Sequence, residues 1–538
     1  MLTIDRNLTK QRTDYTIYCS RTGKRSKTIS DVIIRNGWLI DGTGNPRYRA
    51  DIVLEGERIA GIGQFPKAKA SIDIDAGGKI VSPGFIDAHS HSDKTLKLNP
   101  NNESTIRQGV TSEVVGNCGG SQVRMAEDVD NTFGEYLASV QKIGTSANFA
   151  WLIGHNTLRK IAGVQGENVS PDQMEKMKAI LRQSLEEGAI GLSTGLEFDP
   201  GRNAKFEEVL ELVKVVKEYD GMYTSHIRNR ADNVLPALDE FINTIGSSDC
   251  RGQVSHMNIR YNTGAPDRAF EQCVDKIEKA RAKGFEVLAD MTPLNYGTGG
   301  MAAILPPWVL AEGKDKAVEY LKDPKTRKRL RTDCDRYWRF IHNGEWDRVR
   351  MQSNSGFPEV NGMEFLKIAE LWKKDPWDCY FDILAASRVS GSLYGRLFTD
   401  EHLKETISNP LYMLAMDGNS TTIEEPLSKY TAIPLHFMGM TYFLTHHVRT
   451  VHTLSLEEAI RKMTSMTATH FRLKDRGLLR KGMFADLVVF DFEKLDTVST
   501  FEKPLAYVKG VEHVFVNGAQ VIDRMNHTGI RSGKNLFN

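Results

Sequence analysis

The middle of the chain repeats one cycle eight times: a short apolar run, a polar or glycine-rich loop, and in several cases a helical stretch. The eight runs are SPGFIDAHSH, TSEVVGNC, NFAWLIGH, EGAIGLSTG, MYTSHI, RGQVSHM, FEVLADM and YMLAMDG. Most are continuously apolar, which is typical of parallel strands covered on both faces. This cycle predicts an α/β fold built on a (β/α)8 TIM barrel, with an open doubly wound sheet as the alternative.

The two ends of the chain have a different texture from the middle. Short alternating runs such as DVIIRNGWLIDGTG begin at Asp31, and the C-terminal end has the same pattern in ADLVVFDF and VEHVFVNGAQVID. Alternation broken by Asn-Gly and other turn pairs predicts antiparallel strands joined by hairpins. We therefore predict a polar N-terminal arm over residues 1–30, a small β-sandwich domain built from residues 31–82 and 480–538, and a barrel domain over residues 83–479.

One connection inside the predicted barrel is unusually long. More than a hundred residues separate Met291 from Leu411, and they include a tract dense in lysine, arginine and aspartate from Lys322 to Arg350. Connections of this length in a compact domain are usually functional segments such as active-site lids. We expect a lid insertion over about residues 305–400, after the seventh strand.

Composition and charge exclude several classes of protein. The chain has 538 residues with 70 Lys and Arg against 69 Asp and Glu, and it lacks the basic stripe that nucleic-acid binding requires. No apolar run approaches the ~20 residues that span a membrane, and the N-terminus lacks the apolar region of a signal peptide. The six cysteines are too widely spaced to form a disulfide framework. We expect a cytoplasmic protein that binds a small molecule and binds neither nucleic acid nor membrane, and a homo-oligomer is compatible with the sequence.

Polar residues gather at the ends of the predicted strands. The C-terminal ends of barrel strands surround the open mouth of the fold, where ligands bind. His89 and His91 end the first strand and, being two residues apart in an extended chain, can face the same side. Four further strands, the second, fifth, sixth and eighth, end in Cys118, His226, His256 and Asp417.

Each of these residues also has an ordinary structural interpretation. A single histidine at a strand end is often a hydrogen-bonded structural residue, a buried cysteine often packs as a small apolar side chain, and an aspartate before glycine often forms a turn. Their joint position at the same end of five strands instead favours a metal site, because thiolates and imidazoles are the ligands that Zn²⁺ prefers. His155, which ends the third strand, is a weaker candidate for contact with a substrate.

Several motifs together resemble the amidohydrolase superfamily and, within it, the D-aminoacylase or N-acyl-D-amino-acid deacylase family. They are FIDAHSHSD, QGVTSEVVGNCGGS, EGAIGLSTGLEFDPG, HIRN, VSHMN and the tail RGLLRKGMFADLVVFD followed by VNG. The resemblance extends from about Asp31 to the C-terminus. Its most specific element is Asn-Cys-Gly on the second strand, because most other amidohydrolases use a carboxylated lysine or a glutamate there.

The resemblance implies a metal centre with two unequal positions. One Zn²⁺ would be held tightly by Cys118, His226 and His256. A second position, weak or vacant, would be held by His89 and His91 and bridged by the cysteine.

The resemblance also implies an activity, the zinc-dependent hydrolysis of a C–N amide bond in an N-acyl amine or an N-acyl-D-amino-acid-like substrate. Asp417 would be the general base and acid, taking a proton from a metal-activated water and delivering it to the leaving nitrogen. Two alternatives stay open from the sequence: a cyclic amide or carbamate hydrolase on the same barrel, and a non-catalytic scaffold that kept the fold.

The sequence departs from the family pattern at positions that could contact a substrate. The lysine usually found two residues after the sixth-strand histidine is Asn258, and the family's Tyr-Pro-Tyr reads Thr292-Pro293-Leu294. The glutamate expected after HIRN is Arg230, and two family arginines fall at Lys429 and His436. Because Arg and Lys bind carboxylates by charge-assisted hydrogen bonds, these losses predict weaker activity on N-acyl-D-amino acids than on neutral amides.

Overall fold

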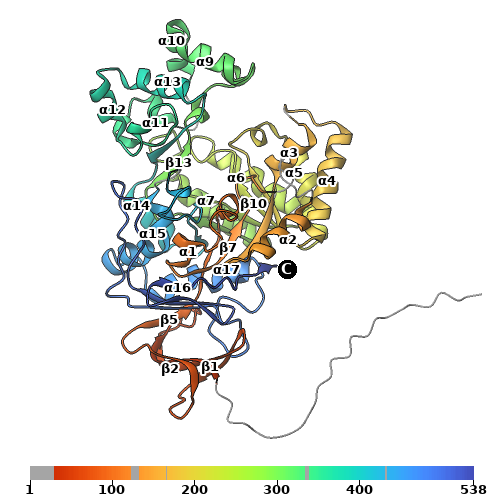
Figure 1. Cartoon of the computed structure of the whole chain (residues 1–538). Helices are drawn as coiled ribbons and strands as arrows, with labels where there is room; N and C mark the ends of the chain where they lie inside the picture. The colour runs from red at the N-terminus through yellow and green to blue at the C-terminus, as the bar shows by residue number, and fades with distance from the viewer. Residues whose placement is uncertain (1–29, 123–131, 165, 334–337, 430–432, 538) are drawn as a thin grey trace, which may run out of the picture.

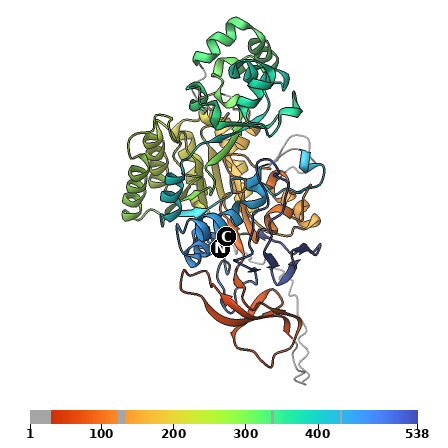
Figure 2. The same ribbon diagram turned by 90° about the vertical axis from the view of Figure 1, so that its left-hand side faces the viewer.

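The computed structural model describes residues 30–122, 132–164, 166–333, 338–429 and 433–537. A barrel occupies the centre, with a β-sheet at one end and the helices α9 (Lys314–Lys322) to α13 (Pro376–Ala386) at the opposite end in both views (Figures 1 and 2). All but the last residue of the predicted N-terminal arm lies outside the described residues. In the described part of the chain, each helix is too short or too polar to cross a lipid bilayer.

Eight parallel strands form the barrel, and they are the eight predicted from the apolar runs. In chain order they are β6 (Phe85–Asp87), β7 (Val110–Val115), β8 (Asn148–Gly154), β9 (Gly191–Gly195), β10 (Met222–His226), β11 (Arg251–Val254), β12 (Val287–Met291) and β16 (Tyr412–Leu414). Each strand pairs with its neighbour in chain order, and the short strand β21 (Asn535–Leu536) adds to β8. The prediction of a parallel eight-stranded barrel is confirmed.

Backbone contacts between the first and last strands nearly close the barrel. The amide of Asp417 donates to the carbonyl of His89 at 2.9 Å, and the amide of His91 donates to the carbonyl of Gly418 at 2.6 Å. The buried carboxylate of Asp87 adds a side-chain link, because it accepts a hydrogen bond of 3.0 Å from the amide that precedes Asp417. The closure therefore involves the predicted site residues themselves.

Helices cover the outside of the barrel. They include α3 (His155–Ala162), α4 (Pro171–Glu186), α5 (Phe206–Glu218), α6 (Val234–Ser248) and α7 (Ala269–Ala282). The other helices in the connections between barrel strands and after the last strand include α1 (Glu103–Ile106), α2 (Phe133–Ile143), α15 (Pro434–Tyr442), η7 (Phe443–Thr450), α16 (Leu456–Met463) and α17 (Ser465–His470). The start of α4 shows how the sequence fixes such a helix: Ser170 and Gln173 form a capping box, and Pro171 is the first helical residue. Met177 and Leu181, one turn apart, are both buried and fix the inward face.

Both ends of the chain contribute strands to a second sheet of nine strands. The N-terminal strands are β1 (Ser30–Leu39), β2 (Tyr48–Glu55), β3 (Arg58–Gly63), β4 (Ala70–Asp75) and β5 (Ile80–Pro83), and the C-terminal strands are β17 (Leu487–Phe490), β18 (Val511–Val516), β19 (Ala519–Asp523) and β20 (Asn526–His527). Antiparallel pairing of β5 with β17 joins the two ends. The division of this region into a separate sandwich domain stays a prediction.

The long segment between β12 and β16 forms a small sheet and a group of helices. The antiparallel sheet has the order β13 (Tyr296–Gly300), β15 (Ser392–Arg396), β14 (Val349–Ser353). The helices are η3 (Met301–Ile304), α8 (Pro307–Leu310), α9, α10 (Pro324–Asp333), α11 (Arg339–His342), η4 (Trp346–Arg348), η5 (Pro358–Val360), α12 (Phe365–Trp372), α13 and α14 (Asp400–Ser408). Stacked aromatic rings, such as Trp346 on Phe365 with centroids 5.0 Å apart, form the core of this segment.

A buried ion pair connects the C-terminal strands to the barrel. The side chains of Arg476 and Asp486 are only 3% and 5% exposed. Asp486 also accepts a hydrogen bond from the Asn517 amide at 2.8 Å, and the Asn517 side chain donates to Asn148 of β8 at 2.8 Å. We predict that Asp486→Ala lowers the free energy of unfolding by about 3–5 kcal/mol, because the charge of Arg476 would stay buried without a counter-charge.

The matched control for this prediction is Asp475→Ala. Asp475 pairs with Arg58 at 2.8 Å, but the two side chains are 54% and 44% exposed. Removing an exposed pair should change the free energy of unfolding by about 1 kcal/mol or less. Urea denaturation of both variants measures the difference, and equal losses would contradict the importance we give to burial.

Candidate active site

The cysteine of the second strand lies at the centre of three imidazoles at one end of the barrel. Cys118 Sγ is 3.3 Å from His89 Nε2, 3.6 Å from His226 Nδ1 and 3.3 Å from His256 Nε2. These side chains come from the ends of four strands that were predicted to converge. Cys118, His226 and His256 border a cavity of about 440 Å³ at the mouth of the barrel, and His89 lies buried behind them.

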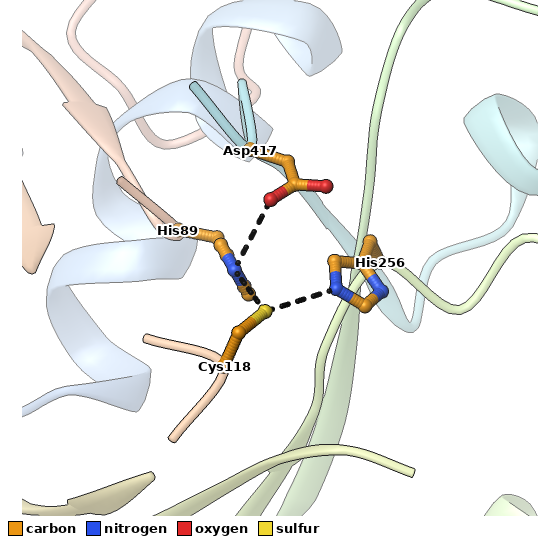
Figure 3. Close-up of side chains that lie close together, drawn as sticks. All are labelled: His89, Cys118, His256 and Asp417. Atoms are coloured by element: carbon orange, nitrogen blue, oxygen red, sulfur yellow. Dashed lines mark hydrogen bonds and ion pairs between the residues drawn. The ribbon is translucent and has the colours of Figure 1, made fainter. Parts of the chain in front are cut away.

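The carboxylate of the eighth strand completes the group. Asp417 Oδ1 lies 3.2 Å from His91 Nε2 and 3.5 Å from His89 Nε2. Figure 3 shows Asp417, His89, Cys118 and His256 pointing toward one another from separate parts of the chain. Their ligand atoms all lie within 4.8 Å of one another, a spacing at which they could share one metal ion.

The backbone at these positions has an unusual conformation. Cys118, His256 and Asp417 have φ values of 51°, 33° and 50°, in the left-handed region that non-glycine residues seldom adopt. Each of them lies two or three residues after the end of its strand. Strained turns of this kind persist where the surrounding structure fixes them, and they often occur at functional sites.

The Asn-Cys-Gly motif explains how one such turn is held. The Asn117 side chain donates to the carbonyl of Val114 at 2.9 Å, which ties the turn back to the end of β7. Gly119 has a φ of 76°, and a Cβ atom there would lie 2.5 Å from Asn156 Oδ1. The motif therefore needs a glycine after Cys118 for both conformation and space.

The surroundings fix the charge states of the ligand atoms. Burial raises the pKa of the Cys118 thiol, but the positive charge of the neighbouring His89 and hydrogen bonds from the imidazoles lower it well below its usual value. Burial lowers the pKa of His256 to about 4, so its imidazole is neutral near pH 7. Burial would raise the pKa of Asp417, but its electrostatic interactions with the surrounding imidazoles, including a hydrogen bond from His91, hold it below its ordinary value.

A thiolate, neutral imidazoles and a carboxylate are the donors that Zn²⁺ takes in proteins. Metal ligands of these types must be deprotonated to bind, and the surroundings of Cys118 and His256 favour the deprotonated forms. The donor set of this cavity therefore fits zinc.

Two carboxylates, Asp290 fully buried and Glu197 with its side chain 10% exposed, support the histidines from behind. Glu197 accepts a hydrogen bond from His226 Nε2 at 2.7 Å and binds both terminal nitrogens of Arg260 at 2.7 Å. Asp290 accepts from the amide of His256 at 2.8 Å, and its other oxygen lies 3.6 Å from His89 Nδ1. Because Glu197 binds Nε2 of His226, the Nδ1 atom of the same ring faces the thiol of Cys118.

The sequence analysis did not single out these supporting residues. Glu197 lies two residues after β9, and Asp290 lies in β12, one residue before that strand ends. Their position at strand ends was the available signal. Arg260, four residues after His256, carried no such signal, and only the tertiary structure brings it to Glu197.

Three predicted substrate-binding residues lie outside the described cavity lining. His155 begins α3, and its Nε2 is bonded at 2.8 Å to the buried carboxylate of Glu208. Asn258 is fully buried and accepts from the amide of Thr292 at 3.3 Å, and Leu294 is buried in the apolar core. Neither is among the described residues that border the cavity.

Two other candidates do line the cavity. Thr292 and His436 both border it, and burial lowers the pKa of His436 to about 3, so this imidazole is neutral. Lys429 ends the short helix η6 (Leu427–Lys429), and its side chain lies outside the described residues.

The insertion after β12 supplies another wall of the cavity. Gly297 and Gly300 of β13, Gln352 of β14 and Ser392 of β15 all line it. Because β13 is glycine-rich, part of this wall is backbone, which allows a ligand to approach the strand closely. Two cations from the barrel loops, Lys94 and Arg230, border the same cavity.

Comparisons with known proteins place this chain in a family. Residues 74–228 and 367–522 match the Amidohydrolase family. The chain is 32% identical over 513 residues to N-acyl-D-glutamate deacylase of Alcaligenes xylosoxydans xylosoxydans, covering 91% of this chain and 93% of the relative. It is 28% identical over 523 residues to D-aminoacylase of the same organism, covering 94% and 97%. The chain therefore belongs to the amidohydrolase family.

Solved structures agree with this assignment. N-acyl-D-glutamate deacylase from Bordetella bronchiseptica, in complex with zinc and a phosphonate mimic of the tetrahedral intermediate, is 28% identical with a TM-score of 0.79, covering 95% of this chain and 100% of that one. A structure of D-aminoacylase, studied for the role of its binuclear metal center, is 26% identical with the same TM-score and coverage.

The contacts of Glu197 generate a prediction about zinc affinity. We predict that Glu197→Gln weakens zinc binding by about tenfold to a hundredfold, because His226 would lose the carboxylate that orients it. A competition titration with a zinc indicator measures the affinity.

Glu208→Gln is the matched control, because Glu208 is also a buried carboxylate that binds one histidine and one arginine, His155 and Arg159. It lies outside the described cavity lining and should leave zinc affinity unchanged. If both variants lost zinc equally, the effect would come from general destabilisation rather than from orientation of His226.

Proposed function

We propose that this protein is a zinc-dependent hydrolase of a C–N amide bond in an N-acyl amine or N-acyl amino acid. One observation carries the proposal: Cys118, His89, His226, His256 and Asp417 lie together at the mouth of the barrel, and all of them except the buried His89 line one cavity. Family membership supports it, since similar proteins include N-acyl-D-glutamate deacylase and D-aminoacylase. No feature of the described site favours a cyclic amide or a non-catalytic role.

The chain has the ligand residues for the two metal positions that its resemblance to the family implies. Cys118, His226 and His256 would hold the tightly bound zinc, and His89 and His91 would hold a weaker or vacant position. When bound, zinc would supply a Lewis acid that polarises the substrate carbonyl and lowers the pKa of water.

Asp417 is the residue we assign to proton transfer. It lines the cavity, and its side chain is 32% exposed, so a water molecule can reach it. As a carboxylate it can take the proton of the attacking water and deliver it to the leaving nitrogen, which must be protonated because an amide anion is a poor leaving group. The backbone bond to the His89 carbonyl fixes its position.

The rest of the cavity would hold the substrate in place. Where the second metal position is vacant, His91, which borders the cavity within hydrogen-bond distance of Asp417, can donate an N–H to a developing oxyanion. We also propose that the insertion acts as the lid expected from its length, because β14 and β15, which lie within its predicted bounds, border the cavity. A covered site excludes water and strengthens electrostatic interactions inside it.

A substrate panel tests the function directly. Zinc-loaded protein should release free amine from at least one linear N-acyl amine or N-acyl amino acid, chelation should abolish the release, and added zinc should restore it. A protein with full zinc content that hydrolyses none of these amides would contradict the proposal.

The role of Asp417 generates a separate prediction. Asp417→Asn should lower kcat by about 10²–10⁴-fold, because the amide cannot accept the proton, while zinc content stays near that of the parent. Cys118→Ala should instead remove the metal. Elemental analysis and amine release on the same samples separate the two effects, and near-normal turnover by Asp417→Asn would show that another group transfers the proton.

A further inference from the structure

A buried carboxylate that no role above uses lies behind the closure of the barrel. Glu113 belongs to β7, and its side chain is fully buried. Its carboxylate accepts hydrogen bonds from the hydroxyl groups of Ser90 at 2.6 Å, of Thr105 at 2.9 Å and of Ser92. Glu113 is not among the described residues that border the cavity. Any effect on the site must therefore pass through the groups that it holds.

Two of these donors alternate with the histidines of the first strand. Ser90 lies between His89 and His91, and Ser92 follows directly. Neighbouring side chains in an extended segment face opposite sides. The two imidazoles face the metal-binding side, whereas the two serine hydroxyls reach Glu113. The carboxylate thus holds, from the reverse side, the segment that carries both histidines.

The same network reaches the segment after the eighth strand. The hydroxyl oxygen of Ser92 accepts a hydrogen bond of 2.7 Å from the backbone amide of Ser420. Because a hydroxyl group has a single proton, Ser92 gives that proton to Glu113 while its oxygen holds the amide. Thr105 Oγ1 lies 3.1 Å from the Ser420 hydroxyl and adds a second link. Ser420 is three residues after Asp417, so Glu113 connects the two sides of the barrel closure.

The position of His91 depends on this support. Its Nε2 lies 3.2 Å from Asp417 Oδ1, but its Nδ1 is buried and has no hydrogen-bond partner among the described residues. His226 differs, because Glu197 binds the far side of its ring. With no such partner, the His91 imidazole is placed by its backbone segment, which is the segment that Glu113 holds.

A carboxylate is suited to the centre of this network. An ionised carboxylate only accepts, so it can take all three hydroxyl protons, whereas a glutamine side chain would turn an NH₂ donor toward at least one hydroxyl. Burial raises the pKa of Glu113 above its ordinary value, and the three hydroxyl donors oppose that rise. The carboxylate and its donors therefore stabilise one another.

We propose that Glu113 is a positioning residue, which acts through the serine hydroxyls to fix His91 and Asp417 at the spacing that proton transfer requires. The catalytic part of this proposal rests on the proposed function. Proton transfer requires Asp417 within hydrogen-bond reach of the attacking water, and a displacement of about 1 Å can slow such a step about a hundredfold. The spacing itself can be measured without turnover.

Kinetics of the isosteric variant Glu113→Gln provide the first test. On an amide that the zinc-loaded parent hydrolyses, we expect kcat to fall about tenfold to a hundredfold, with KM and zinc content near those of the parent. Adding Glu113→Gln to Asp417→Asn should lower kcat little further, because the group through which Glu113 acts is already lost. An unchanged kcat, losses that multiply in the double variant, or loss of the tightly bound zinc would overturn the proposal.

Two substitutions of one donor test the network without removing the carboxylate. Thr105→Val removes the hydroxyl at nearly constant side-chain size, and Thr105→Ser keeps it. We expect a lower kcat for the first variant and a kcat near that of the parent for the second, and equal values would count against the network. Glu208→Gln is the control, because it alters a buried carboxylate outside the described cavity lining and should leave kcat unchanged.

Crystal structures of the zinc-loaded parent and of Glu113→Gln separate this proposal from the proposed function. In the variant we expect the Asp417 carboxylate and the His91 imidazole to lie farther apart by about 0.5 Å or more, with the surroundings of Cys118 unchanged. An unchanged spacing would overturn the role of Glu113 whether or not the parent is active. A wider spacing in the variant, when the parent hydrolyses none of the amides, would support that role and count against the hydrolase.

Discussion

The closure of the barrel between its first and last strands is the constraint on which the site depends. The amide of Asp417 bonds to the carbonyl of His89, and the amide of His91 bonds to the carbonyl of Gly418. These backbone bonds bring two histidines and a carboxylate from residues more than three hundred positions apart in the chain into one group. A barrel left open at this seam would separate the acid from the imidazoles, so fold closure and site assembly are the same event.

A second constraint is electrostatic and centres on Cys118. A buried thiolate is unfavourable unless cations or donors surround it, and here three imidazoles lie within 3.6 Å of the sulfur. Two carboxylates support these histidines: Glu197 accepts a hydrogen bond from the His226 imidazole, whereas Asp290 accepts one from the backbone amide of His256 and lies 3.6 Å from the His89 imidazole. This layered arrangement sets the orientation and charge of the ligands before any metal binds, which limits the reorganisation that binding requires.

The cavity combines parts with different origins. The barrel supplies the metal-binding end, whereas the insertion supplies a wall through β13, β14 and β15. We therefore expect substrate selection to depend on how this long connection, which we propose as a lid, borders the mouth, because connections of this kind vary more freely than the barrel.

The sequence by itself determined the eight strands, the ends at which His89, His91, Cys118, His226, His256 and Asp417 lie, and the family, because strand periodicity and strand-end motifs are local patterns. It could not determine which nearby residues reach the cavity. Asn258 and Arg230 each lie within four residues of a strand-end histidine, yet only Arg230 borders the cavity. That difference, like the pairing of Glu197 with Arg260, was decided by the tertiary structure, because the direction of a side chain in a loop depends on contacts with distant segments that no local pattern encodes.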